Sequence, residues 1–149
     1  MANFTIADIK ALREQLGTGM VDTKKALEEA DGDLEKATEI LRLKGAKGNA
    51  KRADRSTSEG LVAVVESATA VTLIELACET DFVAKNERFI ALADKVVDAV
   101  AAAKANSVED ALAASAGSQS VGELISDEAA IIGEKIELRQ VRTVTGDAV

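Results

Sequence analysis

The sequence contains no histidine, proline, tryptophan or tyrosine, and it has one cysteine. Without histidine, the usual general base and the usual zinc ligand of enzymes are both missing. A single cysteine cannot form an internal disulfide, which is typical of a protein from a reducing compartment. No phosphate-binding loop, nucleophile triad or metal-binding cysteine cluster occurs either. These absences favour a protein that binds other molecules over an enzyme, and they predict no metal and no cofactor.

Long hydrophobic runs are also missing, and the N-terminal residues lack the basic and apolar segments of a signal peptide. The 26 acidic and 18 basic residues give a net charge of −8, which argues against nucleic-acid binding as the main activity. The sequence therefore predicts a soluble cytoplasmic protein with protein partners and without a membrane or strong nucleic-acid partner. The lack of proline, which averages about 5% of residues, suggests a piece of a longer protein.

Three amphipathic helices are expected between residues 5 and 45. The first begins at Thr5, which forms a predicted capping box with Asp8. Apolar residues recur at helical spacing in each segment, and glycines separate the segments, with Gly45 expected to end the third. Since each stripe needs a partner surface, the three helices predict a small N-terminal domain over residues 1–55.

Five basic residues follow within residues 44–55. We interpret this stretch as a solvated linker with a frayed helical turn. The alternative is a nucleic-acid-binding patch, but no aromatic side chain is interspersed to stack on bases.

The remainder of the chain, residues 56–149, predicts an α+β domain. Residues 61–66 and 71–78 are rich in β-branched residues and should form an antiparallel hairpin. A third strand is expected over residues 134–141, with a bulge where its alternation slips between Leu138 and Val141. Helices, the longest over residues 87–104, should cover this three-stranded sheet.

The stretch from Cys78 to Phe89 joins the predicted second strand to the long helix. It places an acid, a large apolar ring and a base at the end of a strand, and such connections often carry function. Two interpretations of Phe82 stay open. The commoner role of such a ring is a core anchor, whereas the alternative is an exposed ring that enters a partner's pocket.

Two segments resemble the bacterial elongation factor Ts family. They are residues 12–27, LREQLGTGMVDTKKAL, and residues 79–87, ETDFVAKNE. The resemblance implies a ubiquitin-associated-like (UBA-like) three-helix domain at residues 1–55, and it implies the first half of the family's α+β core at residues 56–149. The second half of that core, with its usual histidine and prolines, is expected to be absent.

The resemblance also implies a function: guanine-nucleotide exchange on elongation factor Tu, without binding nucleotide directly. Thr80, Asp81, Phe82 and Val83 would form the tip that disturbs the partner's Mg²⁺ site. Further partner contacts are implied for the following residues: Met20, Lys24, Ile132 and Gly133. An alternative is a module that binds this GTPase but exchanges poorly, because half of the core is missing. A third hypothesis, ranked lower, is an RNA-associated factor acting through residues 44–55.

Overall fold

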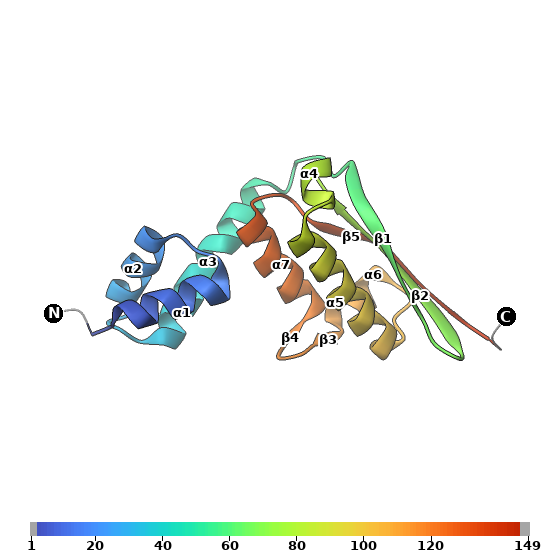
Figure 1. The fold of residues 1–149 in the computed structure, drawn as a ribbon, viewed down its shortest axis with the longest axis horizontal. Helices are drawn as coiled ribbons and strands as arrows, with labels where there is room; N and C mark the ends of the chain where they lie inside the picture. Colours follow the sequence, from blue (N-terminus) through green and yellow to red (C-terminus); the bar gives the residue numbers. More distant parts are fainter. Residues whose placement is uncertain (1–2, 147–149) are drawn as a thin grey trace.

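The computed structural model describes residues 3–146, which form a group of N-terminal helices followed by a helix-covered sheet (Figure 1). The N-terminal group consists of α1 (Ile6–Leu16), α2 (Met20–Glu29) and α3 (Leu34–Lys51). Both halves of the predicted capping box at Thr5 and Asp8 are present. The apolar faces of the three helices share a core of their own, centred on the fully buried Leu27.

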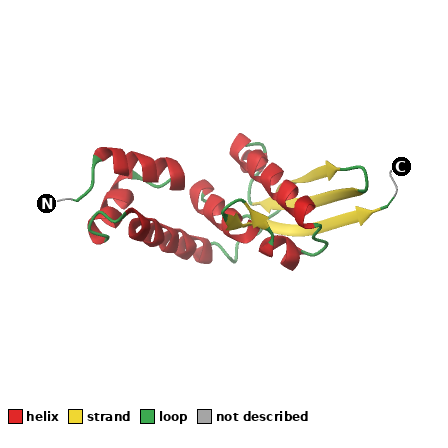
Figure 2. Ribbon diagram, turned by 90° about the horizontal axis from the view of Figure 1, so that it is seen from below, coloured by secondary structure: helices red, strands yellow, loops and turns green. Residues whose placement is uncertain are grey.

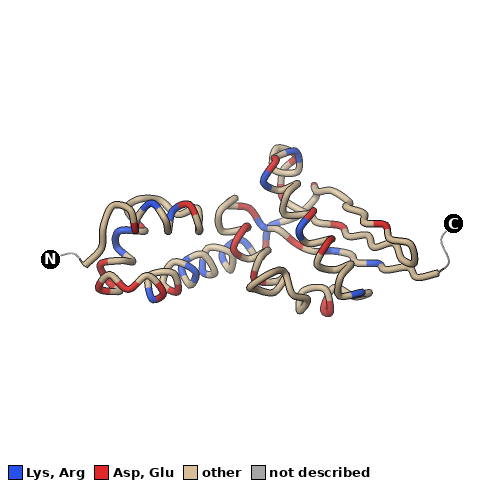
Figure 3. The backbone as a smooth tube through the Cα atoms, turned by 60° about the horizontal axis from the view of Figure 1, so that its bottom comes forward, with Lys and Arg blue, Asp and Glu red and all other residues tan. Residues whose placement is uncertain are grey.

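The prediction that Gly45 ends the third helix is wrong. Helix α3 continues through Gly45 to Lys51, so most of the expected linker, including Lys44, Lys47 and Lys51, belongs to the helix. Figure 3 colours the basic residues along this helix blue. A Cβ atom at Gly45 would lie 3.0 Å from the Cβ of Ala130 on α7 (Val121–Ile132). The missing side chain therefore lets two helices approach closely, and this packing outweighs the low helix propensity of glycine.

The second part of the chain contains an antiparallel sheet in the order β1 (Glu59–Glu66), β2 (Ala70–Cys78) and β5 (Glu137–Thr145). The predicted hairpin and the predicted bulge are confirmed. The register shifts on β5 so that Arg139 has no partner on β2, between Leu138 and Gln140. The third strand begins later than expected, at Glu137, because Glu134 and Lys135 bond to the end of β2 instead.

Helices α5 (Glu87–Ala103), α6 (Val108–Ala113) and α7 lie on one side of this sheet (Figure 2). Their apolar side chains and those of the inner sheet face form the larger core, which includes Phe89 and Ile74. A short hairpin of β3 (Ser115–Ala116) and β4 (Gln119–Ser120) precedes α7. The predicted α+β fold is thus confirmed. Within residues 3–146, no helix has the length and apolar character that crossing a membrane requires.

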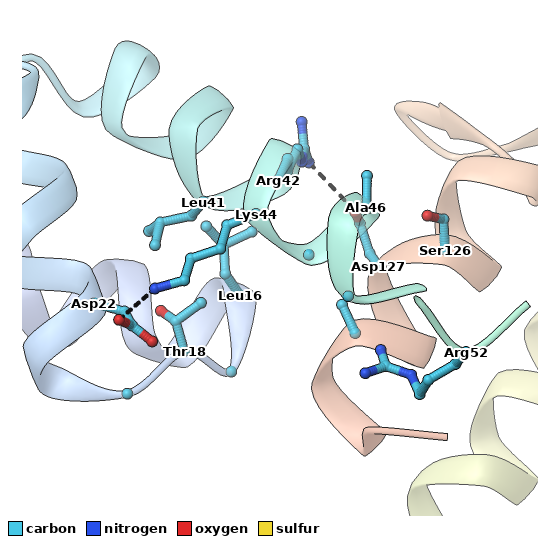
Figure 4. A pocket seen from close by; sticks show the side chains of 15 residues that line it. Leu16, Thr18, Asp22, Leu41, Arg42, Lys44, Ala46, Arg52, Ser126 and Asp127 are labelled. Carbon is cyan, nitrogen blue, oxygen red and sulfur yellow. Dashed lines mark hydrogen bonds and ion pairs between the residues drawn. The ribbon is translucent and has the colours of Figure 1, made fainter. Parts of the chain in front are cut away.

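The N-terminal helices contact the sheet-containing part mainly through α7. The carboxylate of Asp127 lies 3.6 Å from the guanidinium of Arg42, and the Asn49 amide donates to the backbone oxygen of Ser126 at 2.9 Å. Figure 4 shows Asp127 on α7 facing Arg42 on α3, beside a pocket that both helices line. Burial raises the pKa of Asp127, and the nearby Arg42 lowers it by a smaller amount. Helix α3 of the N-terminal group therefore packs against α7 through the close approach at Gly45 and through these polar contacts.

Candidate partner-binding site

The segment after β2 forms a one-turn helix, α4 (Asp81–Ala84), at one end of the sheet. Thr80 is its N-cap, and the hydroxyl oxygen of Thr80 accepts a hydrogen bond from the backbone N–H of Val83 at 3.4 Å. The side chain of Val83 packs partly buried against the larger core. Asp81 is exposed, and its carboxylate lies 3.7 Å from the ammonium group of Lys85. The cap and Val83 thus fix the turn to the sheet, while Asp81 points its charge into solvent.

Phe82 is 83% exposed, although it is the largest side chain of this turn. Its interpretation as a core anchor is wrong, because Phe89 on the next helix occupies the core instead. An exposed aromatic ring costs hydrophobic free energy unless a partner covers it. The exposed ring is therefore the feature that makes α4 a candidate binding site.

Two carboxylates hold the base of α4 to the turn after α7. One oxygen of Glu134 accepts the backbone N–H groups of Glu79 and Thr80, each at 3.1 Å, and the other oxygen accepts the Thr80 hydroxyl at 2.8 Å. In return, the Glu79 carboxylate accepts the backbone N–H of Lys135 at 2.8 Å. Arg55 adds a longer contact of 3.4 Å to the same Glu79 carboxylate. We call Glu79 and Glu134 the carboxylate clamp.

Cys78 directly precedes Glu79 of the carboxylate clamp and is fully buried. Its thiol donates to the backbone oxygen of Thr80 at 3.3 Å. Burial, and to a smaller extent the Glu134 carboxylate, raise the pKa of the Cys78 thiol to about 11. The thiol is therefore protonated at neutral pH, and it serves as a packed small residue rather than a nucleophile.

The remaining residues of the predicted site fall into two groups. Ile132 and Gly133 end α7 immediately before Glu134, so the structure brings them beside the Thr80–Val83 segment. Met20 and Lys24 lie on α2, in the N-terminal group of helices and away from α4 (Figure 1). Met20 is 56% exposed, and the ammonium group of Lys24 lies 3.8 Å from Glu28.

Glu134 and Arg55 belong to this site although the sequence predicts Glu134 in a strand and Arg55 in a linker. Both meet the end of β2 only through the tertiary fold, so no local pattern could have identified them. In the described part of the chain, residues 3–146, no three potential acidic or cysteine ligands come together to hold a metal ion. The geometry therefore offers an exposed ring on a held turn, which suits protein recognition.

Comparison with known proteins yields one family. The family described as "Elongation factor TS" matches residues 79–149. Elongation factor Ts of Leifsonia xyli is 76% identical over 150 residues, which cover 100% of this chain and 54% of that protein. The Clavibacter sepedonicus protein of the same name is 67% identical, with 99% of this chain and 54% of the relative covered. Elongation factor Ts of Mycolicibacterium smegmatis is 56% identical, with 98% of this chain and 52% of the relative covered.

The chain spans about half the length of the curated relatives that it matches. The alignments with these relatives cover essentially all of its residues, and the family match includes both α4 and the carboxylate clamp. The resemblance noted in the sequence is thus confirmed, and the chain belongs to the elongation factor Ts family.

Proposed function

We propose that this protein acts in translation as a guanine-nucleotide exchange factor, which binds elongation factor Tu in its GDP form and accelerates GDP release. The observation that carries the proposal is the 83% exposure of Phe82 on a short helix held at its base. The names of the relatives support the translation role. The cytoplasm, where translation takes place, is the proposed compartment.

Phe82 enters an apolar pocket of the GTPase, and the neighbouring Asp81 approaches the groups that position Mg²⁺. An aromatic side chain in a partner's pocket is a typical interface anchor, often worth about 2 kcal/mol or more. If the pocket accepts the ring only in the nucleotide-free conformation, then binding the ring weakens GDP and Mg²⁺ by the same factor, because linkage is reciprocal. No covalent bond forms or breaks in this exchange. The protein acts by contact with the GTPase alone, without a cofactor and without binding the nucleotide itself.

Thr80 and Val83 support the ring from within the same turn. Thr80 caps α4, and the side chain of Val83 fastens the turn to the core. Ile132 and Gly133 form a second contact beside the turn. Met20 and Lys24 bind the GTPase through α2, so that two separate surfaces of the chain act on one partner.

Release of fluorescent GDP from elongation factor Tu tests the proposal in a stopped-flow experiment. We expect the wild-type chain to accelerate release and Phe82→Ala to abolish most of that acceleration. A Phe82→Ala chain as active as the wild type would refute the role of the ring. A wild-type chain that neither binds the GTPase nor changes the GDP release rate would refute the function.

A second candidate function is binding without exchange. It is favoured by one observation, namely that the chain spans about half the length of its relatives. In this case the wild-type chain binds elongation factor Tu, but GDP release stays at its intrinsic rate. Titration of binding beside the stopped-flow measurement separates the two functions.

A further inference from the structure

We propose that Glu134 is the positioning residue that sets the direction of Phe82. The inference deepens the proposed function and rests on it for the part that concerns GDP release. Glu134 does not need to touch the GTPase for this role. It acts through Thr80, which begins the turn that carries the ring.

The hydrogen bonds of Glu134 hold the N-cap residue of α4 through both its backbone and its side chain. Its carboxylate accepts the backbone N–H and the hydroxyl of Thr80, at 3.1 and 2.8 Å. Because the hydroxyl proton is committed to Glu134, a lone pair of the same oxygen faces the backbone N–H of Val83. Glu134 therefore orients the cap as well as the backbone from which the turn starts.

The turn needs such support because it has little stability of its own. A helix of four residues gains too few hydrogen bonds to offset the cost of ordering its backbone. The exposed ring of Phe82 has few contacts that could hold it in place. Hydrogen bonds to a charged carboxylate are among the stronger ones available in a protein.

Other contacts near the turn are weaker candidates for this role. The pairs Asp81–Lys85 and Arg55–Glu79 are largely exposed on at least one side and lie at 3.7 and 3.4 Å. Exposed ion pairs of this kind contribute little. Val83 anchors one point of the turn but does not set the direction in which the turn begins. Glu134 provides three charge-assisted hydrogen bonds at that starting point.

Loss of these hydrogen bonds should lower the fraction of molecules in which the Phe82 ring has the orientation that binds the GTPase. The apparent affinity for the nucleotide-free GTPase falls in proportion to that fraction. Since hydrogen bonds to charged groups are comparatively strong, we expect Glu134→Ala to reduce the efficiency of GDP release about tenfold or more. Glu134→Gln keeps an acceptor for the backbone N–H groups and a donor for Thr80, so it should stay within about threefold of the wild type.

Cys78 offers an independent measure of whether the turn is closed. It is the only cysteine, and its thiol donates to the backbone oxygen of Thr80. We would measure alkylation by uncharged iodoacetamide in the wild type, Glu134→Ala and Glu134→Gln. Both variants remove the charge that helps to raise the pKa of the Cys78 thiol. A difference between the two variants therefore reports opening of the turn rather than thiol ionisation. The exposed Glu109 on α6 provides a matched control, Glu109→Ala.

The expected result has two parts. Cys78 in Glu134→Ala should be labelled at least about tenfold faster than in Glu134→Gln, which is the factor expected from losing charged hydrogen bonds. Of these two variants, only Glu134→Ala should lose most of the exchange efficiency. Glu134→Asp, whose carboxylate is one methylene short, should fall between them. It also serves as the test if Glu134→Ala does not fold. Glu109→Ala should match the wild type in both measurements.

Three outcomes would overturn the inference. Equal labelling of the Ala and Gln variants would show that Glu134 does not hold the turn. Equal loss of exchange in both variants would show that the negative charge of Glu134, rather than its hydrogen bonds, is needed for exchange. Loss of exchange in Glu134→Ala without faster labelling would point to direct contact with the GTPase. If the wild-type chain does not accelerate GDP release, the proposed function fails, and the labelling comparison alone decides whether Glu134 positions the turn.

Discussion

Phe82 and Phe89 lie on consecutive helices, and the first ring is 83% exposed while the second is fully buried. Residues 83–88, which run from the rest of α4 to the start of α5, separate the two rings along the chain. Phe89 fills the space between α5 and the sheet, so the sheet core gains its aromatic anchor without using Phe82. One ring is thereby available for recognition.

Replacing each ring by alanine should affect a different property, namely stability for Phe89 and partner binding for Phe82. Phe89→Ala removes a buried ring and should cost about 3–5 kcal/mol of unfolding free energy. Phe82→Ala should change the unfolding free energy by less than about 0.5 kcal/mol, since its ring is exposed. It should weaken binding to the GTPase by about 2 kcal/mol or more, near thirtyfold. Urea unfolding and GDP release measure the two effects, and a large stability loss in Phe82→Ala would contradict this assignment.

Gly17 and Gly133 provide a matched pair for the contact between the N-terminal helices and α7. Both have left-handed backbones, with φ of 63° and 82°. A Cβ atom at Gly17 would lie 2.7 Å from a side-chain carbon of Ile131. A Cβ atom at Gly133 would have no such neighbour within 4 Å. Gly133→Ala should therefore cost only the left-handed conformation, about 1–2 kcal/mol. Gly17→Ala should cost about 1–3 kcal/mol more, because its methyl group overpacks against Ile131.

Thermal and urea unfolding of both variants test this comparison. Ile131→Ala, added to Gly17→Ala, should recover part of the loss, since it removes the atoms that the new methyl group meets. Equal destabilisation by the two glycine substitutions would show that the Gly17–Ile131 contact is not constraining.

The Cys78 thiol predicts a stability change at alkaline pH. Its pKa rises from 9.0 to about 11 on folding, so the folded protein holds this proton more tightly than the unfolded chain does. The resulting stability is complete below pH 9 and is lost as the pH rises from 9 towards 11. Urea unfolding between pH 8 and 11 should therefore show the advantage of the wild type over Cys78→Ala shrinking in that window. A constant difference across the range would contradict the raised pKa.

Val144 is 61% exposed on β5, which is an outer strand in the described part of the sheet. Exposed apolar edge strands promote association between chains, and we expect this edge to lower solubility. Val144→Lys should reduce light scattering at high protein concentration and change the unfolding free energy by less than about 0.5 kcal/mol. A wild-type chain that unfolds sharply and reversibly without scattering would argue against this expectation.

Local patterns in the sequence were sufficient for much of the fold. The capping box at Thr5 and Asp8, the hairpin of β1 and β2 and the bulge near Arg139 all depend on neighbours in sequence or on strand alternation. The end of α3 could not be predicted in this way. Gly45 is a helix-ending signal by propensity, but its contact with Ala130 depends on a helix far along the chain.

The candidate site shows the same limit. The motif around Phe82 identified the turn and the family, but apolar character alone favours a buried ring and does not reveal that this ring is exposed. Its exposure depends on where β2 ends relative to α5 and α7. Glu134 reaches the turn across a large sequence separation, so its three hydrogen bonds could be found only in the folded chain.

Helix α3 acts as a spacer of defined length and phase between α2 and the sheet. Its 18 residues extend over about 27 Å at 1.5 Å per residue. Inserting one residue between Arg42 and Asn49 would rotate the helices before it by about 100° relative to α7, since a turn takes 3.6 residues. Met20 and Phe82 would then face a common partner in the wrong relative orientation, with each surface still intact. An insertion at this place should thus uncouple the two surfaces, while the buried Ala37 and Leu41 earlier in the helix keep their packing in the N-terminal core.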